Sequence, residues 1–230
     1  MPVRSSAPQS EGLRQFGFAL EPRSTFVLDL SVGEERLWSQ VIESSCRRAI
    51  RKAQSRGVLV EEVRLQDIVD TYVEMSAQVF AKHHRPPPLG REAFAKIAEV
   101  LEGSPLAKVF AARHQGRLLA AGIFPFDRRC IYYLDGASSP EGLALRPNNL
   151  LHWEVIRWAV AAGIARYDMV GAGIASVARF KRTFGAGGVP YTYCYRPLAP
   201  WVGLARRVYA LLAPAGRGVR YFFQPRPRSS

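Results

Sequence analysis

Lys181 is the residue whose surroundings in the sequence favour chemistry most clearly. It lies between Phe180 and Phe184, two aromatic residues that would hold its methylene stem and remove water from its ammonium group. A fixed cation in such a place stabilises a developing oxyanion by about 3 kcal/mol. A surface lysine whose stem lies along apolar side chains is the alternative.

Asp168 is the acid closest to this segment in the sequence. It lies near the end of the apolar, β-prone stretch 164–170, which Gly171-Ala172-Gly173 follows. Its carboxylate would accept a proton from an attacking amine, or orient Lys181 or Arg179. The equally weighted alternative is a structural role, as a helix cap or in the ion pair that a buried carboxylate needs.

Four cations stand within six residues, at Arg47, Arg48, Arg51 and Lys52. Helical spacing places them opposite an apolar face, and arginine side chains bind phosphate through paired N–H groups. A tRNA acceptor, a nucleotide-linked sugar or a pyrophosphate lipid would suit this surface. A solvated helix face remains the alternative.

The segment Arg146-Pro147-Asn148-Asn149 precedes a stretch, 150–160, that is apolar nearly all round and predicts a buried helix. A helix N-terminus favours phosphate. The segment lacks the small glycines of an acetyl-CoA pyrophosphate loop, and Pro147 removes one N–H donor. Asn148 and Asn149 therefore read more simply as helix caps, and His152 as a buried structural residue.

The elements that must position these residues alternate between strands and helices. The pattern predicts strands over 25–30, 58–63, 108–113, 118–124, 130–134, 164–170 and 189–195. It predicts helices from Ser31 through 42, over 44–56 with Gly57 ending it, from Asp67 to 80, over 91–101, and from Asn148 or Asn149 to Gly163. A proline loop covers 83–89, and a glycine-rich loop joins the last two strands. The fold class is therefore α/β (α+β), a mixed sheet with helices on both faces.

Composition sets the domain organisation and the type of partner. We expect a disordered segment over 1–20, one domain over 21–198 and a basic amphipathic tail over 199–230 that contacts an anionic membrane or a partner, or docks on the domain. The net charge of +13 favours polyanionic partners, with a generally arginine-rich composition as the alternative.

The three cysteines are odd in number and far apart, and predict neither a disulfide framework nor a metal site. No secretory signal or apolar span is present in the sequence, so we expect a cytoplasmic protein, with peripheral contact to the inner membrane face.

Four segments in this order resemble the FemAB-like or BioF2-like acetyltransferase family of the GNAT superfamily. They are 47–53 with Gly57-Val58, the hairpin with Tyr132 and Gly136-Ala137, 147–153, and Tyr167-Asp168 with 179–185. The resemblance covers 25–196 and implies a GNAT-like fold that transfers an acyl or aminoacyl group to an amine. It places Lys181 in the family's Phe-Lys pair, near the reacting acyl group.

These observations together give one expected site and one expected reaction. We expect catalysis at Lys181 and Asp168, and substrate or phosphate binding at Arg47, Arg48, Arg51, Lys52, Arg179, Phe180, Asn148, Asn149 and Tyr132. No tightly bound cofactor is expected, and acyl-CoA or aminoacyl-tRNA would serve as co-substrate, with an amine-bearing, phosphorylated acceptor from cell-envelope or polysaccharide metabolism.

Two alternatives to this reaction stay open, and the resemblance also bears on assembly. Family members usually have two GNAT-like halves, and this chain resembles the second, so a homodimer or a separate partner chain would supply the other. The main alternative is a catalytically inactive half that binds polyanions or membranes. A conventional small-molecule N-acetyltransferase is disfavoured by the missing glycines.

Overall fold

The computed structural model describes residues 3–5, 11–81, 87, 89–171 and 174–196. The helices are η1 (Glu11–Phe16), α2 (Glu34–Arg36), the π-helix η2 (Leu37–Val41), α3 (Ser44–Ser55), α4 (Leu65–Ala81), α5 (Arg91–Glu102), η3 (Glu141–Leu145), α6 (Pro147–Ala161) and α7 (Ala175–Thr183). The strands are β1 (Val3–Ser5), β2 (Ala19–Asp29), β3 (Leu59–Glu62), β4 (Ala107–His114), β5 (Arg117–Pro125), β6 (Cys130–Tyr132), β7 (Asp135–Ser138), β8 (Arg166–Asp168) and β9 (Gly187–Tyr195).

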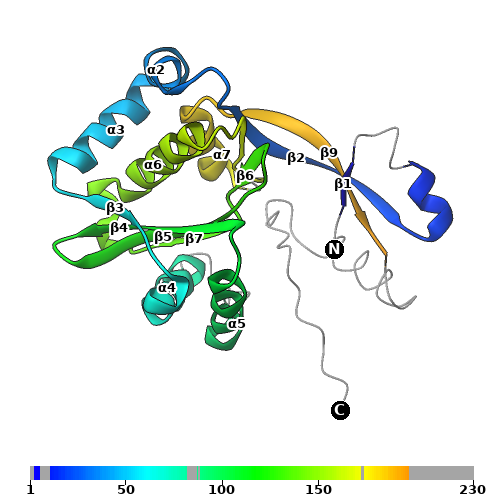
Figure 1. The fold of residues 1–230 in the computed structure, drawn as a ribbon, viewed down its shortest axis with the longest axis horizontal. Coiled ribbons are helices and arrows are strands. Elements are labelled where there is room, and N and C mark those ends of the chain that lie inside the picture. Colours follow the sequence, from blue (N-terminus) through cyan, green and yellow to red (C-terminus); the bar gives the residue numbers. More distant parts are fainter. Residues whose placement is uncertain (1–2, 6–10, 82–86, 88, 172–173, 197–230) are drawn as a thin grey trace.

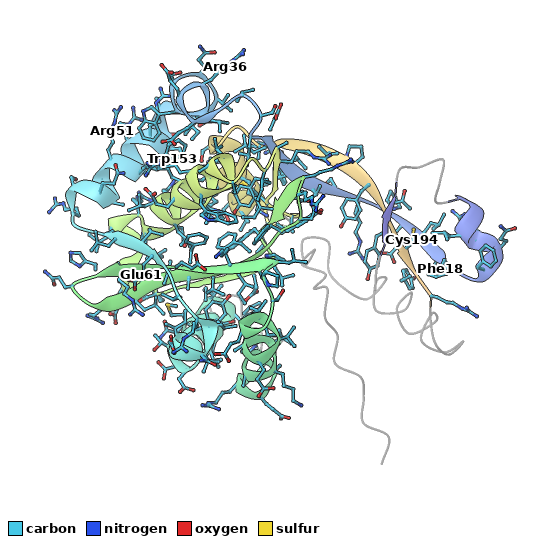
Figure 2. The ribbon with its side chains drawn as sticks, viewed as in Figure 1. Phe18, Arg36, Arg51, Glu61, Trp153 and Cys194 are labelled. Carbon is cyan, nitrogen blue, oxygen red and sulfur yellow. The ribbon has the colours of Figure 1, made fainter. Side chains whose placement is uncertain are left out.

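The strands form two sheets, which Figure 1 shows meeting near β6. One sheet has the order β1-β9-β2-β8-β6, and the other has the order β3-β4-β5-β7. Strands β6 and β8 run parallel to each other, whereas the other described pairs are antiparallel. The long β2–β9 ribbon extends away from the helices α3 to α6, and Phe18, just before β2, and Cys194 of β9 lie near its far end (Figure 2).

Helices cover both faces of the four-stranded sheet. Helix α6 packs on β3, β4 and β5 and is itself covered by α3, while α4 and α5 pack together on the opposite face (Figure 1). Alternation along β4 divides its side chains between the two layers, because successive residues of a strand point to opposite faces. Phe110 and Ala112 join the larger core on the α6 side, and Val109 and Ala111 join the smaller core under α4 and α5.

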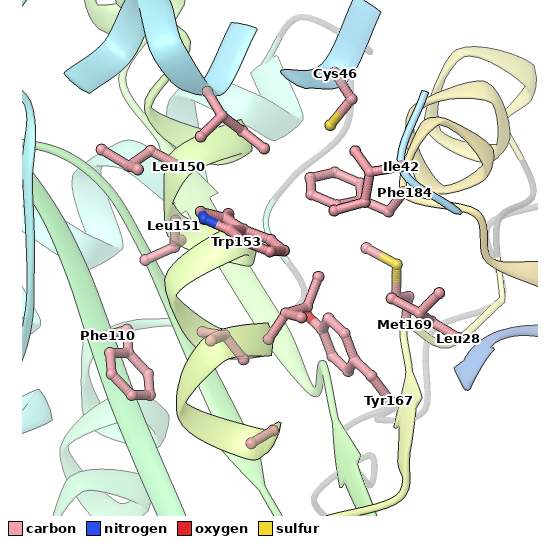
Figure 3. Packing of buried hydrophobic residues seen from close by; sticks show 14 of the residues in the cluster. Leu28, Ile42, Cys46, Phe110, Leu150, Leu151, Trp153, Tyr167, Met169 and Phe184 are labelled. Carbon is pink, nitrogen blue, oxygen red and sulfur yellow. The ribbon is translucent and has the colours of Figure 1, made fainter. Parts of the chain in front are cut away.

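The larger core also joins the two sheets. Figure 3 shows Trp153 of α6 at its centre, with Tyr167 and Met169 of the β8 segment nearby. Phe184, which ends α7, is fully buried in the same cluster. This core therefore fixes α6 and α7 against β8, the elements that carry the expected site.

Most predicted elements are confirmed, and the helix over 44–56 is the clearest case. Its apolar positions Cys46, Ile50 and Ala53 are buried in α3. Gly57 follows the helix with φ +75°, the left-handed conformation in which glycine ends helices without steric cost. The predicted mixed α/β fold with helices on both faces is confirmed as well.

Several local predictions are wrong. The helix after Ser31 starts beyond Gly33, because the Ser31 hydroxyl donates to Asp29 instead of capping. Helix α6 starts at Pro147, after Arg146 with φ +59°, so neither Asn148 nor Asn149 is its cap. Helix α4 starts at Leu65, ahead of the predicted Asp67.

Larger differences occur at the ends of predicted segments. The sequence predicts a loop after 170, yet residues 175–183 form α7. Residues 3–5 form β1 and residues 11–16 form η1, within the segment 1–20 that was expected to be disordered. The tail 199–230 and most of the proline loop lie outside the described residues. Within the described chain, no helix is long and apolar enough to cross a bilayer.

Candidate active site

The predicted strand 130–134 changes partners in the middle, and we call this place the fork. Strand β6 pairs with β8 as far as Tyr132 opposite Asp168, and the Tyr133 N–H still donates to the Asp168 carbonyl at 2.9 Å. The next N–H, of Leu134, donates to Ile123 of β5 at 3.0 Å, and β7 continues along β5. The chain therefore leaves β8 just beyond Tyr133 and continues as β7 in the other sheet.

Two glycines make room for an aromatic ring at the fork. Gly122 and Gly136 are cross-strand partners in β5 and β7. A side-chain carbon on Gly136 would overlap the Tyr133 hydroxyl, and one on Gly122 would lie 2.8 Å from the Phe124 ring. The Gly136-Ala137 pair of the family resemblance thus has a physical reason, because the Tyr133 ring occupies the space of the missing side chain.

His152 lies behind this ring and is neutral. Its Nδ1 is 2.6 Å from the Tyr167 hydroxyl, and its ring packs edge-on against Tyr133 and Phe180. Burial, followed by the positive charge of Lys181, lowers the His152 pKa to about 3. This buried, hydrogen-bonded position fits the structural role that the sequence favours for His152, which stays a prediction.

Lys181 lies beside the fork, but its ammonium faces the backbone. Its Nζ donates to three carbonyls, those of Met169, of Val170 at 3.1 Å and of Gly171 at 3.0 Å. An ammonium has three protons, so all of them are used. The side chain is 3% exposed, and burial lowers the Lys181 pKa to about 8 while Asp168 acts in the opposite direction. The expected oxyanion role stays a prediction. It requires the Lys181 ammonium to break one of these three hydrogen bonds so that it can donate to the oxyanion.

Asp168 is also buried, and it holds the other side of the same peptide segment. It accepts hydrogen bonds from the Thr25 hydroxyl and from the Val170 N–H, the latter at 2.8 Å. Val170 has φ +56°, a left-handed conformation that is costly for a β-branched residue. Asp168 and Lys181 therefore clamp a strained residue between them, one at its N–H and the other at its carbonyl.

A cationic pocket of about 390 Å³ opens between α3, the start of α6 and α7. It is lined by Ser45, Cys46, Arg48, Ala49, Lys52, Arg146, Asn149, Phe180 and Thr183. None of these described lining residues is acidic. Three cations thus face one cavity at the N-terminus of a 15-residue helix, where the helix dipole also favours anions.

The structure divides the predicted cation cluster into two pairs, each one helical turn apart. Arg48 and Lys52 line the cationic pocket. Arg47 instead donates to the carbonyls of Trp38 and Ile42, which closes the π-helix η2, and the Arg51 guanidinium lies 5.4 Å from the centre of the Trp38 ring. Figure 2 shows Arg51 on the outer side of α3.

The other predicted binding residues are only partly brought together. Asn149 and Phe180 line the cationic pocket with Arg48 and Lys52, whereas Asn148 and the exposed Arg179 are not among the described residues that line it. Tyr132 lies on β6, where its hydroxyl is 3.4 Å from an Asp127 carboxylate oxygen. Arg146 also lines the pocket but was not among the predicted binding residues; the signal was a cation directly before a proline that starts a helix.

Cys46 and Asn149 close the inner wall of the cationic pocket. The Asn149 amide donates to the Cys46 sulfur at 3.5 Å. Burial raises the Cys46 pKa, so the thiol stays protonated and is no nucleophile at neutral pH. Among the described residues there is also no group of three or more His, Cys, Asp or Glu side chains that would hold a metal ion.

Comparison with known proteins places the chain in a family. The model of the acetyltransferase (GNAT) domain matches residues 43–182. FemX is 16% identical and superposes with a TM-score of 0.70 over 90% of this chain and 71% of FemX. The C-terminal domain of a protein from Agrobacterium fabrum named as a lysylphosphatidylglycerol synthetase is 16% identical, with a TM-score of 0.61 over 94% of this chain and 73% of that domain. L-PGS from Bacillus licheniformis is 13% identical, with a TM-score of 0.58 over 91% and 71% of the two chains.

At these identities the structural likeness establishes the fold alone. None of the curated proteins compared with the sequence matches it. The domain match, however, covers more than half of the chain and includes α3, the fork, α6 and most of α7. The chain belongs to the acetyltransferase (GNAT) domain family.

Proposed function

We propose that this protein is an N-acyltransferase that moves an acyl or aminoacyl group from a phosphate-bearing donor to an amine. The observation that carries the proposal is the cationic pocket, which combines Arg48 and Lys52 of α3 with Arg146 at the start of α6. Acyl-CoA and aminoacyl-tRNA differ in most respects but share phosphate groups and an activated acyl carbon. The pocket suits that shared feature.

The cationic pocket is connected to the fork through three rings. Phe180 lines the pocket and lies 5.4 Å, between ring centres, from His152. His152 in turn lies 4.7 Å from Tyr133 at the fork. The proposal places the acyl end of a donor beside Phe180, on the side of the pocket that faces the fork.

The relatives favour a cell-envelope substrate. One of them carries the name lysylphosphatidylglycerol synthetase, which denotes an aminoacyl group and an anionic lipid. We extend these two features to this chain as part of the proposal. The donor would carry an aminoacyl group, the acceptor would be an amine that is itself phosphorylated, and the transfer would take place at the inner membrane face. Contact of 201–230 with the membrane, binding of tRNA, and a homodimer or partner chain belong to the same proposal.

Matched arginine and lysine variants test the donor site. Arg48→Ala and Lys52→Ala each remove a cation that lines the pocket, whereas Arg51→Ala removes the same charge from a side chain that lies on Trp38. Binding of acetyl-CoA, and separately of an aminoacyl-tRNA, is measured by calorimetry or filter binding at two salt concentrations. We expect at least a tenfold loss for the two pocket variants and less than a threefold loss for Arg51→Ala. Equal losses in all three would mean that only net charge matters, and would remove the pocket from the proposal.

A second function is favoured by the geometry of Lys181. Because all three of its protons are donated to backbone carbonyls, the cation expected to stabilise the oxyanion is engaged elsewhere. The chain would then be a non-catalytic module that binds polyanions or membranes. Pocket-dependent binding without turnover, for every donor tested, would support this function over the first.

A further inference from the structure

Asp135 stands at the fork on the face opposite the cationic pocket. It is the first residue of β7, directly after the strand has left β8. It shares a face of β7 with Ala137, which belongs to the smaller core under α4 and α5. The cationic pocket, in contrast, opens on the side of α3 and α6. Two substrates that enter from opposite faces would meet at the fork.

The Asp135 carboxylate is held by a buried tyrosine. The Tyr72 hydroxyl of α4 donates to Asp135 Oδ2 at 2.6 Å, and Tyr72 itself is fully buried. Asp135 remains partly exposed. A carboxylate offers about four acceptor positions, so Tyr72 leaves room for a substrate N–H.

Burial also makes this carboxylate a stronger base than usual. It raises the Asp135 pKa, against the Tyr72 hydroxyl and the Gly136 N–H, which act in the opposite direction. A base whose pKa lies closer to the working pH removes protons more effectively.

The other titratable groups close to the fork are less suitable as bases. His152 is fully buried and bonded to Tyr167, and its low pKa makes it a weak base. Asp168 is 5% exposed and already bonded to Thr25 and to the Val170 N–H. Lys181 is bonded to three carbonyls. Of these groups, Asp135 alone combines a fixed orientation with partial exposure.

We propose that Asp135 is the catalytic residue that accepts the proton of the attacking ammonium, and that Tyr72 is the positioning residue that orients its carboxylate. This inference rests on the proposed acyl transfer. One N–H bond of the ammonium breaks, and its proton passes to the Asp135 carboxylate. The freed electron pair forms the C–N bond with the acyl carbon, and the C–S bond of a thioester, or the C–O bond of an ester, breaks. The leaving thiolate or alkoxide takes the second proton from nitrogen, and Asp135 returns the first to water.

Two amines of different basicity test this assignment. A lysine side-chain amine is protonated at neutral pH and needs a base, whereas hydroxylamine is unprotonated and does not. Turnover is measured with both amines for wild type, Asp135→Asn, Tyr72→Phe and Asp70→Asn. Asp70→Asn is the matched control, because Asp70 is an exposed carboxylate on α4, the helix that carries Tyr72, and is paired with Arg91.

With the lysine amine, we expect Asp135→Asn to lower kcat about 100-fold, within the range for loss of a general base, and the KM of the donor to stay unchanged. Tyr72→Phe should lower kcat about tenfold, since the carboxylate remains but is less well oriented. With hydroxylamine, both variants should stay within about fivefold of wild type, and Asp70→Asn should match wild type with both amines.

Several results would overturn the assignment. The assignment is refuted if kcat of Asp135→Asn with the lysine amine stays within threefold of wild type. It is also refuted if kcat falls equally with both amines, which would indicate a structural role. If Asp135→Asn does not fold, the Tyr72→Phe variant decides. A ratio of kcat with the lysine amine to kcat with hydroxylamine that equals the wild-type ratio refutes the assignment. Absence of turnover in wild type with every donor refutes the proposed function itself, which separates the two failures.

Discussion

Replacing Lys181 by methionine removes an ammonium group whose protons are all donated to backbone carbonyls. Methionine has a similar length and no charge, so the change removes the three hydrogen bonds and keeps a side chain of similar size in the buried position. The carbonyls of Met169, Val170 and Gly171 lose the donor that holds them together. Val170, with φ +56°, loses one of its three backbone hydrogen bonds and keeps those with the Asp168 carboxylate and the Phe26 N–H.

The expected magnitude follows from two opposing effects. A hydrogen bond from a charged donor contributes about 1.5–3 kcal/mol, so the loss of three costs roughly 4–9 kcal/mol. The charge also has a desolvation cost in the folded state, because the Lys181 pKa falls from 10.5 to about 8, and this corresponds to about 3 kcal/mol. We therefore expect Lys181→Met to lower the free energy of unfolding at pH 7 by about 3 kcal/mol.

Urea unfolding followed by circular dichroism measures this difference. A slope of about 2 kcal/mol per molar urea gives a fall of roughly 1.5 M in the midpoint. Lys96→Met is the control, since Lys96 is an exposed lysine of α5 paired with Glu92, and it should change stability by less than about 0.5 kcal/mol. An unchanged midpoint for Lys181→Met together with a lost turnover would refute the structural role and favour the oxyanion role instead.

The pH dependence gives the same prediction a second test. The folded pKa of Lys181 lies below its unfolded value, so the unfolded chain binds more protons between about pH 8 and 10.5. This group therefore makes the wild type more stable as pH rises through that window, whereas the methionine variant lacks the effect. The stability difference between the two should widen from pH 8 towards pH 10.5.

Two further predictions concern the rings at the fork. Gly136→Ala should destabilise the fold by about 2–3 kcal/mol, because the new methyl group overlaps the Tyr133 hydroxyl. Gly103→Ala is the control in thermal unfolding, since a side-chain carbon there has no atom within 4 Å. Equal melting temperatures of the two variants would contradict this packing. His152 has a folded pKa of about 3, below its ordinary 6.5, so its contribution to stability should be lost as pH falls from about 6.5 towards 3, and its imidazole NMR signals should not shift between pH 8 and 5. Titration of His152 near pH 6 would show that the ring is accessible to water.

The predictable part of the fold is the part with regular spacing. Helix α3 has buried residues one turn apart and ends at Gly57, so periodicity defines it without tertiary information. Helix α7 has nine residues, of which only Ala178 and Lys181 are buried, so it lacks a continuous apolar stripe. Its helical form depends on packing against the rest of the chain, which the sequence pattern does not show.

The site was harder to predict than the fold because its residues act through their backbone surroundings. The sequence groups Arg47 with Arg48, but the neighbouring elements separate them, one bonded to the end of η2 and the other facing a pocket made by α6 and α7. The fork depends on a change of strand partner between Tyr133 and Leu134 that alternation does not reveal. Asp135 was missed for the same reason, since its significance comes from the fork and from Tyr72, 63 residues away.

The division of the interior into two cores has a consequence for access to the fork. The smaller core consists of residues from α4, α5 and the four-stranded sheet, whereas the larger core unites both sheets under α6. Cooperative units of unfolding often follow such boundaries. The unit built on the smaller core opens at a lower free energy than the whole protein unfolds. We therefore expect the α4–α5 layer, which carries Tyr72, to open at a lower free energy than the core around α6. In hydrogen exchange, the amides of α4 and α5 would then exchange ahead of those of α6. Such opening would uncover the Asp135 side of the fork and break the Tyr72–Asp135 hydrogen bond at the same time, so the carboxylate is oriented only while the layer is packed.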